Sequence, residues 1–170
     1  MTRAGRALAI SLLALGSACG GRQSAQQNAT PTAAPVEMTL VGTDGQRFGL
    51  SQLRGKPLLL FVFTTFDNAS QLALTPLTSF LGAHPELPAL GIAAQPDPAA
   101  LLPLYRDALD VGIPLAYEAD PQIVSGESML GEIATVPTYV LLDASGRIAA
   151  RHSGPLGSNE LDEFADPVLP

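Results

Sequence analysis

The sequence predicts an α/β domain built on a central mixed sheet flanked by helices. Strand and helix patterns alternate between residues 58 and 109, an order typical of parallel strands joined by crossover helices. Two short strand patterns at 139–142 and 148–150 enclose the turn 143–146, which predicts an antiparallel pair closing the sheet. From Val36 onward about 135 residues remain, enough for one domain whose hydrophobic core is stable without disulfides.

A hairpin is expected at the start of this domain. Short alternating segments lie on either side of Asp44-Gly45, and Asp-Gly between such segments is a strong signal for a tight turn. Residues 50–56 then read as a single helical turn that ends at Gly55.

The apolar run Leu58–Phe63 organises the rest of the chain. It is too short to cross a membrane and shows no polar alternation, so we expect a strand buried on both faces at the centre of the sheet. Asp67, Asn68 and Ser70 can then accept hydrogen bonds from the first turn of a helix. The apolar face of that helix is predicted to contain Leu72, Leu74, Leu77 and Leu81.

The remaining elements follow in order. We expect a buried strand at 87–94 and a helix at 98–109, with apolar positions 101, 102, 104, 105, 108 and 109. After an irregular stretch, a short helix is predicted at 123–130, and a terminal helix at 159–164 covers the sheet.

Several of these segments resemble one known family. GKPLLLFVFTTFDNASQ is similar to the segment of membrane-anchored thioredoxin-like proteins, the TlpA and AhpC/TSA redoxin group, in which a strand precedes Trp-Cys-x-x-Cys. MTLVGTDGQRFGLSQLRGKPLLL resembles the hairpin that opens the redoxin fold, and Val136-Pro137 matches the family's cis-proline. The resemblance covers nearly everything from Val36 to Phe164. It implies a thioredoxin-like fold with an N-terminal β-hairpin extension.

The chain departs from this family at the catalytic positions. With Phe66 on the family's tryptophan, Asp67 stands where the attacking cysteine would be and Ser70 where the resolving cysteine would be. The Sco-type copper chaperones, a second resemblance, would place Phe66 and Ser70 there. Neither alignment restores a thiol. Because disulfide exchange and peroxide reduction both need a thiolate, we expect neither activity and no cofactor.

The residues around the missing thiols have more than one interpretation. Asp67 is favoured as a helix cap over a functional acid, and Ser70 as a first-turn residue over a nucleophile. The resemblance implies a peptide groove beside the cis-proline, with Thr65, Phe66, Val136 and Pro137 as its candidate residues. The alternative is that Phe66 packs into the core. His84 and His152 are expected at the surface, and no metal site is predicted.

The first residues read as an export signal. Residues 1–18 combine Arg3 and Arg6 with a short apolar stretch and small residues, which predicts a secretory signal peptide. The segment ahead of Cys19 resembles a bacterial lipobox, so Cys19 is expected to carry a lipid and residues 19–35 to form a flexible tether. The alternative is ordinary secretion with a free thiol at Cys19. Gly20 gives no aspartate-type retention signal, which favours the outer membrane.

Charge narrows the choice of partners. The formal net charge is -7, and removing Arg3 and Arg6 with the signal takes it to about -9, which argues against nucleic acid. The membrane is expected to be reached through the anchor at Cys19 on the periplasmic side of the cell envelope. The favoured function is a non-catalytic binding or assembly module for an envelope protein or peptide client. A redoxin-group oxidoreductase and a Sco-like copper carrier remain the alternatives.

Overall fold

The computed structural model describes residues 34–169. The predicted signal peptide, Cys19 and most of the predicted tether lie outside the described residues. Within the described part, no helix combines the length and apolar character needed to cross a membrane.

Seven strands form one mixed sheet with the order β2-β1-β5-β4-β3-β6-β7. Their bounds are β1 Thr39–Gly42, β2 Arg47–Gly49, β3 Leu58–Phe63, β4 Ala89–Ala93, β5 Leu115–Glu118, β6 Thr138–Leu142 and β7 Ile148–Ser153. β3, β4 and β5 are mutually parallel, whereas β1 and β2 and also β6 and β7 pair antiparallel. The predicted hairpin extension is therefore present, and β1 joins it to the main sheet by pairing with β5.

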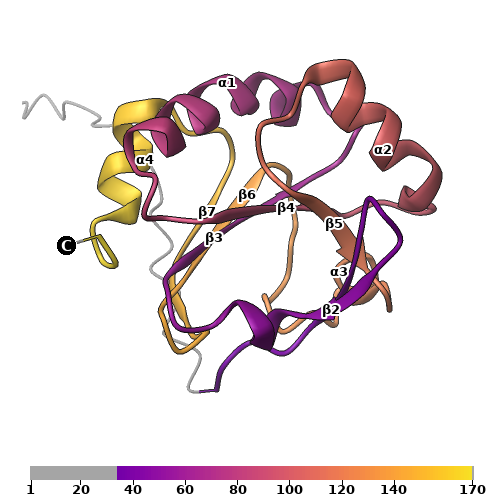
Figure 1. Cartoon of the computed structure of the whole chain (residues 1–170), viewed down its shortest axis with the longest axis horizontal. Helices are drawn as coiled ribbons and strands as arrows, with labels where there is room; N and C mark the ends of the chain where they lie inside the picture. Colours follow the sequence, from indigo (N-terminus) through magenta and orange to yellow (C-terminus); the bar gives the residue numbers. More distant parts are fainter. Residues whose placement is uncertain (1–33, 170) are drawn as a thin grey trace, which may run out of the picture.

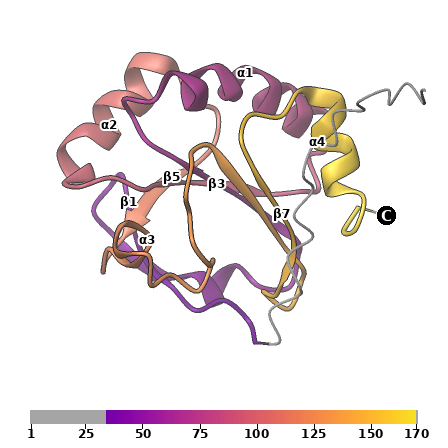
Figure 2. The ribbon, with the colours of Figure 1, turned by 180° about the vertical axis from the view of Figure 1, so that it is seen from behind.

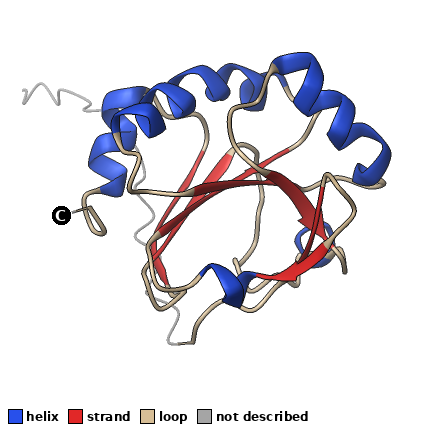
Figure 3. Cartoon of the chain, in the orientation of Figure 1, coloured by secondary structure: helices blue, strands red, loops and turns tan. Residues whose placement is uncertain are grey.

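Helices cover the sheet unequally. The helical elements are η1 Leu50–Leu53, α1 Asn68–Ala83, α2 Pro98–Leu109, α3 Gln122–Ser125 and α4 Ser158–Ala165. Figures 1 and 3 show α1, α2 and α4 together on one side of the sheet, with η1 on the other side. Seen from behind, α3 lies beside β1 (Figure 2).

The core is divided by the sheet into two layers. Phe61 and Phe63 point to the side of α1, α2 and α4, where they meet Leu77 and Leu102. Leu60 and its neighbours on the same face of the sheet pack against residues from η1 and α3. All six residues of β3 are buried, because both faces of this strand are covered. The prediction of a central, doubly buried strand is confirmed.

Most predicted elements are present, with one omission. α2 occupies the predicted range, and the turn before β7 is closed by a hydrogen bond from the Gly146 N–H to the Asp143 carbonyl. However, the stretch predicted as irregular contains β5. The predicted helix at 123–130 is also shorter, since α3 ends at Ser125 and the next residue, Gly126, adopts a left-handed conformation with φ of 79°.

The outer faces of α1 and α2 carry more apolar surface than predicted. Leu74 and Leu77 are buried as expected, but Leu72 is 69% exposed. On α2, Leu102 is buried, while Leu104 is 67% exposed. Each helix therefore buries a narrower stripe than its run of leucines indicated.

Candidate functional site

The candidate site lies where β3 delivers the chain into α1. β3 ends at Phe63 and α1 begins at Asn68. In the antiparallel pairing of β3 with β6, Val62 is opposite Thr138, so one step further Phe63 lies opposite Pro137. The Val136–Pro137 peptide bond is cis, as the resemblance implied. The topology therefore brings the β3–α1 junction and the cis-proline to the same end of the sheet.

Asp67 caps α1. Its backbone is extended, and its Oδ2 accepts a hydrogen bond from the Ser70 N–H at 2.6 Å. This satisfies one of the open donors of the first turn and places a negative charge at the positive end of the helix dipole. The capping role predicted for Asp67 is present in the structure.

Three buried hydroxyl groups lie near this junction without hydrogen-bond partners among the described residues. They belong to Thr64, Ser70 and Tyr105. Ser70 is fully buried, and Tyr105 packs its ring against Phe63 with centroids 5.4 Å apart. Burial raises the pKa of Tyr105 above its ordinary value, and the negative charge of Asp67 adds to the shift. Since no described base contacts the Ser70 hydroxyl, the group lacks the partner that an activated nucleophile needs.

Phe66 does not pack into the core. Its side chain is 72% exposed, so the core-packing interpretation is wrong. Of the other candidate groove residues, Thr65 and Val136 are half-buried and Pro137 is buried. An exposed aromatic ring thus stands on the loop that leads into α1, at the sheet end that also holds the cis-proline.

Gln95 holds this loop in place and was not singled out from the sequence. Its Oε1 accepts a hydrogen bond from the Thr65 N–H at 2.7 Å, and Gln71 donates from Nε2 to the Thr65 carbonyl at 3.1 Å. Gln95 is only 4% exposed. Both polar groups of the Thr65 backbone are therefore fixed by side chains, which makes the loop a defined surface.

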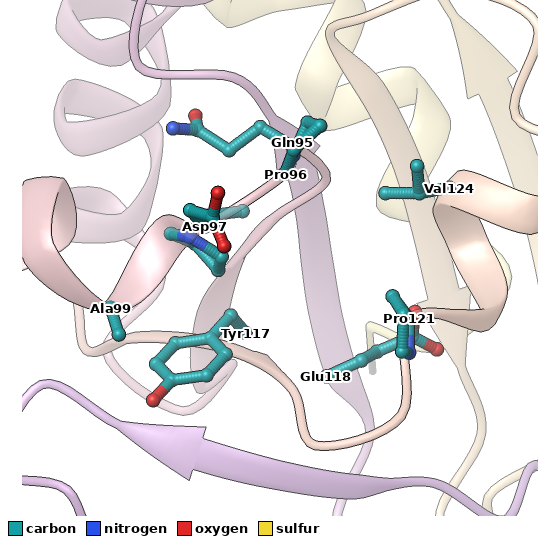
Figure 4. Close-up of a pocket in the computed structure, with 10 residues that line it drawn as sticks. Gln95, Pro96, Asp97, Ala99, Tyr117, Glu118, Pro121 and Val124 are labelled. Atoms are coloured by element: carbon teal, nitrogen blue, oxygen red, sulfur yellow. The ribbon is translucent and has the colours of Figure 1, made fainter.

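A cavity of about 460 Å³ opens next to Gln95, at the carboxyl ends of β4 and β5. In Figure 4 the connection from β4 to α2 forms one side, with Pro96 and Asp97, and Pro121 and Val124 face it across the opening. Tyr117, from β5, lies at its base (Figure 4). The lining is mostly apolar, and the cavity volume lies in the range of small-molecule pockets, about 300–1,000 Å³. The carboxyl ends of parallel strands are the usual place for ligands in such sheets.

The charged groups at this cavity are acidic. Glu118 accepts a hydrogen bond from the Ile123 N–H at 2.6 Å. Burial raises the pKa of Glu118 above its ordinary value, and the nearby Asp120 adds to the effect. Asp97 precedes α2 in a left-handed conformation and does not cap the helix with its side chain. The cavity therefore offers acceptors rather than cations to a bound group.

The two histidines lie away from this site. His84 follows α1 and contacts Asp162 of α4 through Nε2 at 2.8 Å. His152 was expected at an exposed strand end, but it is half-buried between the rings of Tyr139 and Phe164. Burial lowers the pKa of His152. Among residues 34–169, no group of three or more histidine, cysteine, aspartate or glutamate side chains is arranged to hold a metal ion.

Comparisons with solved structures identify the fold. The chain is similar to StoA from Bacillus subtilis, with a TM-score of 0.62 and 19% identity over 79% of this chain and 99% of that one. It is also similar to the exposed lipoprotein thioredoxin Etrx1 from Streptococcus pneumoniae, with a TM-score of 0.64, 16% identity and coverage of 76% and 98%. It is similar, too, to a thiol:disulfide interchange protein of the thioredoxin family from Chlorobium tepidum. That comparison has a TM-score of 0.63 and 19% identity over 84% of this chain and 99% of that one.

These similarities establish a thioredoxin-like fold for the described domain. The identities are too low to carry the activity of those proteins across. No protein-family model matches the chain, and comparison with curated proteins gives no match.

Proposed function

We propose that this protein is a non-catalytic binding or assembly module of the cell envelope that uses a thioredoxin-like domain to hold a protein or peptide client. The client contacts the Thr65, Phe66, Val136 and Pro137 surface, and Cys19 carries the lipid that attaches the chain to the membrane. The observation that carries the proposal is the exposed ring of Phe66, 72% accessible on a loop that contains no thiol.

The absence of thiol chemistry follows from the side chains at the junction. The one cysteine of the sequence is Cys19, far from Asp67 and Ser70. The Asp67 carboxylate, which caps α1, and the buried Ser70 hydroxyl cannot form or exchange a disulfide. Only a thiolate attacks a disulfide sulfur and remains bonded to it. The domain therefore keeps the fold without the reaction.

Binding needs less than catalysis. A client requires an accessible apolar contact on a surface that does not rearrange, since ordering a loose loop costs free energy on association. Phe66 provides such a contact, and the hydrogen bonds of Thr65 to Gln95 and Gln71 hold its loop. Aromatic side chains of this kind dominate the energetics of many interfaces. The adjacent cavity gives room for one client side chain.

The envelope location is supported by the leader-like residues 1–18 and by the lipobox-like segment ahead of Cys19. Etrx1, one of the similar structures, is described as an exposed lipoprotein thioredoxin. A lipoprotein of this design would carry its domain on the tether 19–35, which reaches no more than about 60 Å when fully extended.

Photo-crosslinking in intact cells tests the proposal. A photoreactive phenylalanine analogue is placed at position 66, and the crosslinked products are identified by mass spectrometry. We expect one dominant protein trapped from position 66 with a yield unchanged by thiol reductants, because the contact does not depend on sulfur.

Two control positions make the result specific. Leu72 lies in α1, the helix that follows the Phe66 loop, and is 69% exposed; Glu163 is exposed on α4. The same product trapped equally from positions 66, 72 and 163 would mean collision rather than binding. No product from position 66 would remove the groove as the client site.

A further inference from the structure

A second large hollow lies at the opposite end of the central strands. It has a volume of about 500 Å³ and is lined by Phe48, Leu53, Arg54, Gly55, Lys56, Leu58, Pro88, Ala89, Leu90 and Pro114. Leu58 is the first residue of β3, whereas the Phe66 loop follows its last residue, so the strand separates the two places by roughly 16 Å. This hollow is therefore independent of the proposed client groove.

The floor of the hollow is apolar. Leu58 and Leu90 are each only 4% exposed, and Phe48 is half-buried beside them. The volume lies within the range of about 300–1,000 Å³ found for small-molecule pockets. A floor of this kind favours a ligand with a hydrocarbon portion, because burying apolar surface is the main source of its binding free energy.

The rim is positive in a protein that is otherwise acidic. The region 34–169 contains six lysine and arginine residues, and two of them, Arg54 and Lys56, line this hollow. None of the described residues in its lining is acidic. Two cationic side chains thus gather at one hollow of a chain whose formal net charge is -7.

The two cations are in different states. Arg54 is paired with Glu37 and also donates to the Val36 carbonyl. For Lys56, no ion pair occurs within residues 34–169, and its side chain is exposed at the rim. Lys56 is therefore the cation that remains available to a ligand.

The segment that carries these cations is held in place. Gly55 ends the turn after η1 with φ of 103°, and its N–H donates to the Ala144 carbonyl at 2.9 Å. The Arg54 contacts to Val36 and Glu37 fix the same segment from the other side. An available cation on a fixed backbone segment, at the rim of a hydrocarbon floor, has the chemistry of a site for an amphipathic anion.

From this arrangement we infer that the hollow binds a small amphipathic carboxylate, with its hydrocarbon chain on Leu58 and Leu90 and its carboxylate at Lys56. The inference does not depend on the client groove. Substitution at Phe66 leaves the site unchanged, so failure of one proposal is distinguishable from failure of the other.

Calorimetric titration of the purified protein with decanoate, below its micelle concentration, tests this site. Decanol and decyltrimethylammonium serve as the neutral and cationic probes of similar chain length. We expect saturable one-site binding of decanoate, weaker binding of decanol, and the weakest binding of the cation. Lys56→Gln should weaken decanoate binding by up to about fivefold, the effect of losing one solvent-exposed ion pair, and should leave decanol binding unchanged.

Arg47→Gln is the matched control. Arg47 is exposed and does not line the hollow, so its loss removes the same charge without touching the site, and decanoate affinity should stay as in the native protein. Equal affinity for decanoate and decanol, or equal weakening by the two substitutions, would overturn the site. So would a lack of saturable decanoate binding together with Lys56-dependent binding to phosphatidylglycerol vesicles, since that result would make the surface a membrane contact.

Discussion

Asp67 and Ser70 occupy positions that favour structure over nucleophilic chemistry. The Asp67 carboxylate is engaged by the Ser70 N–H, and the Ser70 hydroxyl is fully buried with no described partner. An unpaired buried hydroxyl costs about 1–3 kcal/mol. These two residues of the same helical turn therefore act on stability with opposite signs.

Substituting each of them in turn tests this assignment. Asp67→Ala should lower the free energy of unfolding by about 1 kcal/mol because the first turn loses its cap, while Asp67→Asn should retain most of it. Ser70→Ala should raise the free energy of unfolding by about 1 kcal/mol, since an unsatisfied group is removed. Urea denaturation measures both values. A Ser70→Ala variant less stable than the native protein would mean that the hydroxyl has a partner after all.

Contacts between residues close together in the chain could be predicted from the sequence, and contacts between residues far apart in the chain could not. The cap at Asp67 follows from a short local pattern, and the cis bond before Pro137 was implied by the family resemblance. The hydrogen bond between Gln95 and Thr65 joins residues 30 positions apart, and nothing in the sequence near Gln95 marks it. The exposure of Phe66 depends on packing that no local pattern describes, which is why both interpretations stayed open.

At the scale of elements, α1 and α4 are joined by His84. Its Nε2 lies 2.8 Å from Asp162 and its Nδ1 lies 3.3 Å from Glu86. The hydrogen bond to Asp162 is the main cause that raises the pKa of His84 above 6.5. Because the folded pKa exceeds the unfolded one, the contribution of His84 to stability is complete below pH 6.5 and is lost as pH rises through the folded pKa.

A pH series on a His84→Gln variant checks this contribution. We expect the native protein to be more stable than the variant at pH 5.5, and the difference to shrink by pH 8, because only protonated His84 forms ion pairs with Asp162 and Glu86. Glu163→Gln, an exposed change on α4 that removes neither hydrogen-bond partner of His84, should show no such dependence. A difference between native protein and His84→Gln that stays constant from pH 5.5 to pH 8 would contradict the coupling.

Element boundaries followed the strength of the local pattern. β3 is a pure apolar run and α2 has a long helical pattern, so both were predicted closely. β5 has only four residues and lies between Pro114 and Pro121. A segment this short with a proline near each end is typical of a loop. Its strand form comes from pairing with β4 and β1 on either side, which is tertiary information.

For the molecule as a whole, the sheet presents two ends of opposite character. The cavity at the carboxyl ends of β4 and β5 includes Asp97 and Glu118, whereas the hollow at the start of β3 includes Arg54 and Lys56. The net negative charge, known from composition alone, does not show that acidic and basic side chains lie at opposite ends of the sheet. Each cavity is assembled from segments far apart in the chain, so neither could be predicted from sequence, although the fold itself could.

We propose that this protein retains the thioredoxin-like fold and has lost thiol chemistry through the side chains at positions 67 and 70. Reduction of insulin disulfides by the purified protein, compared with an Asp67→Cys/Ser70→Cys variant, tests this most directly. We predict that the native protein leaves the uncatalysed rate unchanged, whereas the double variant forms a reversible disulfide and accelerates the reaction. Turnover by the native protein would contradict the claim, and a double variant unable to form the disulfide would contradict the placement of these two positions.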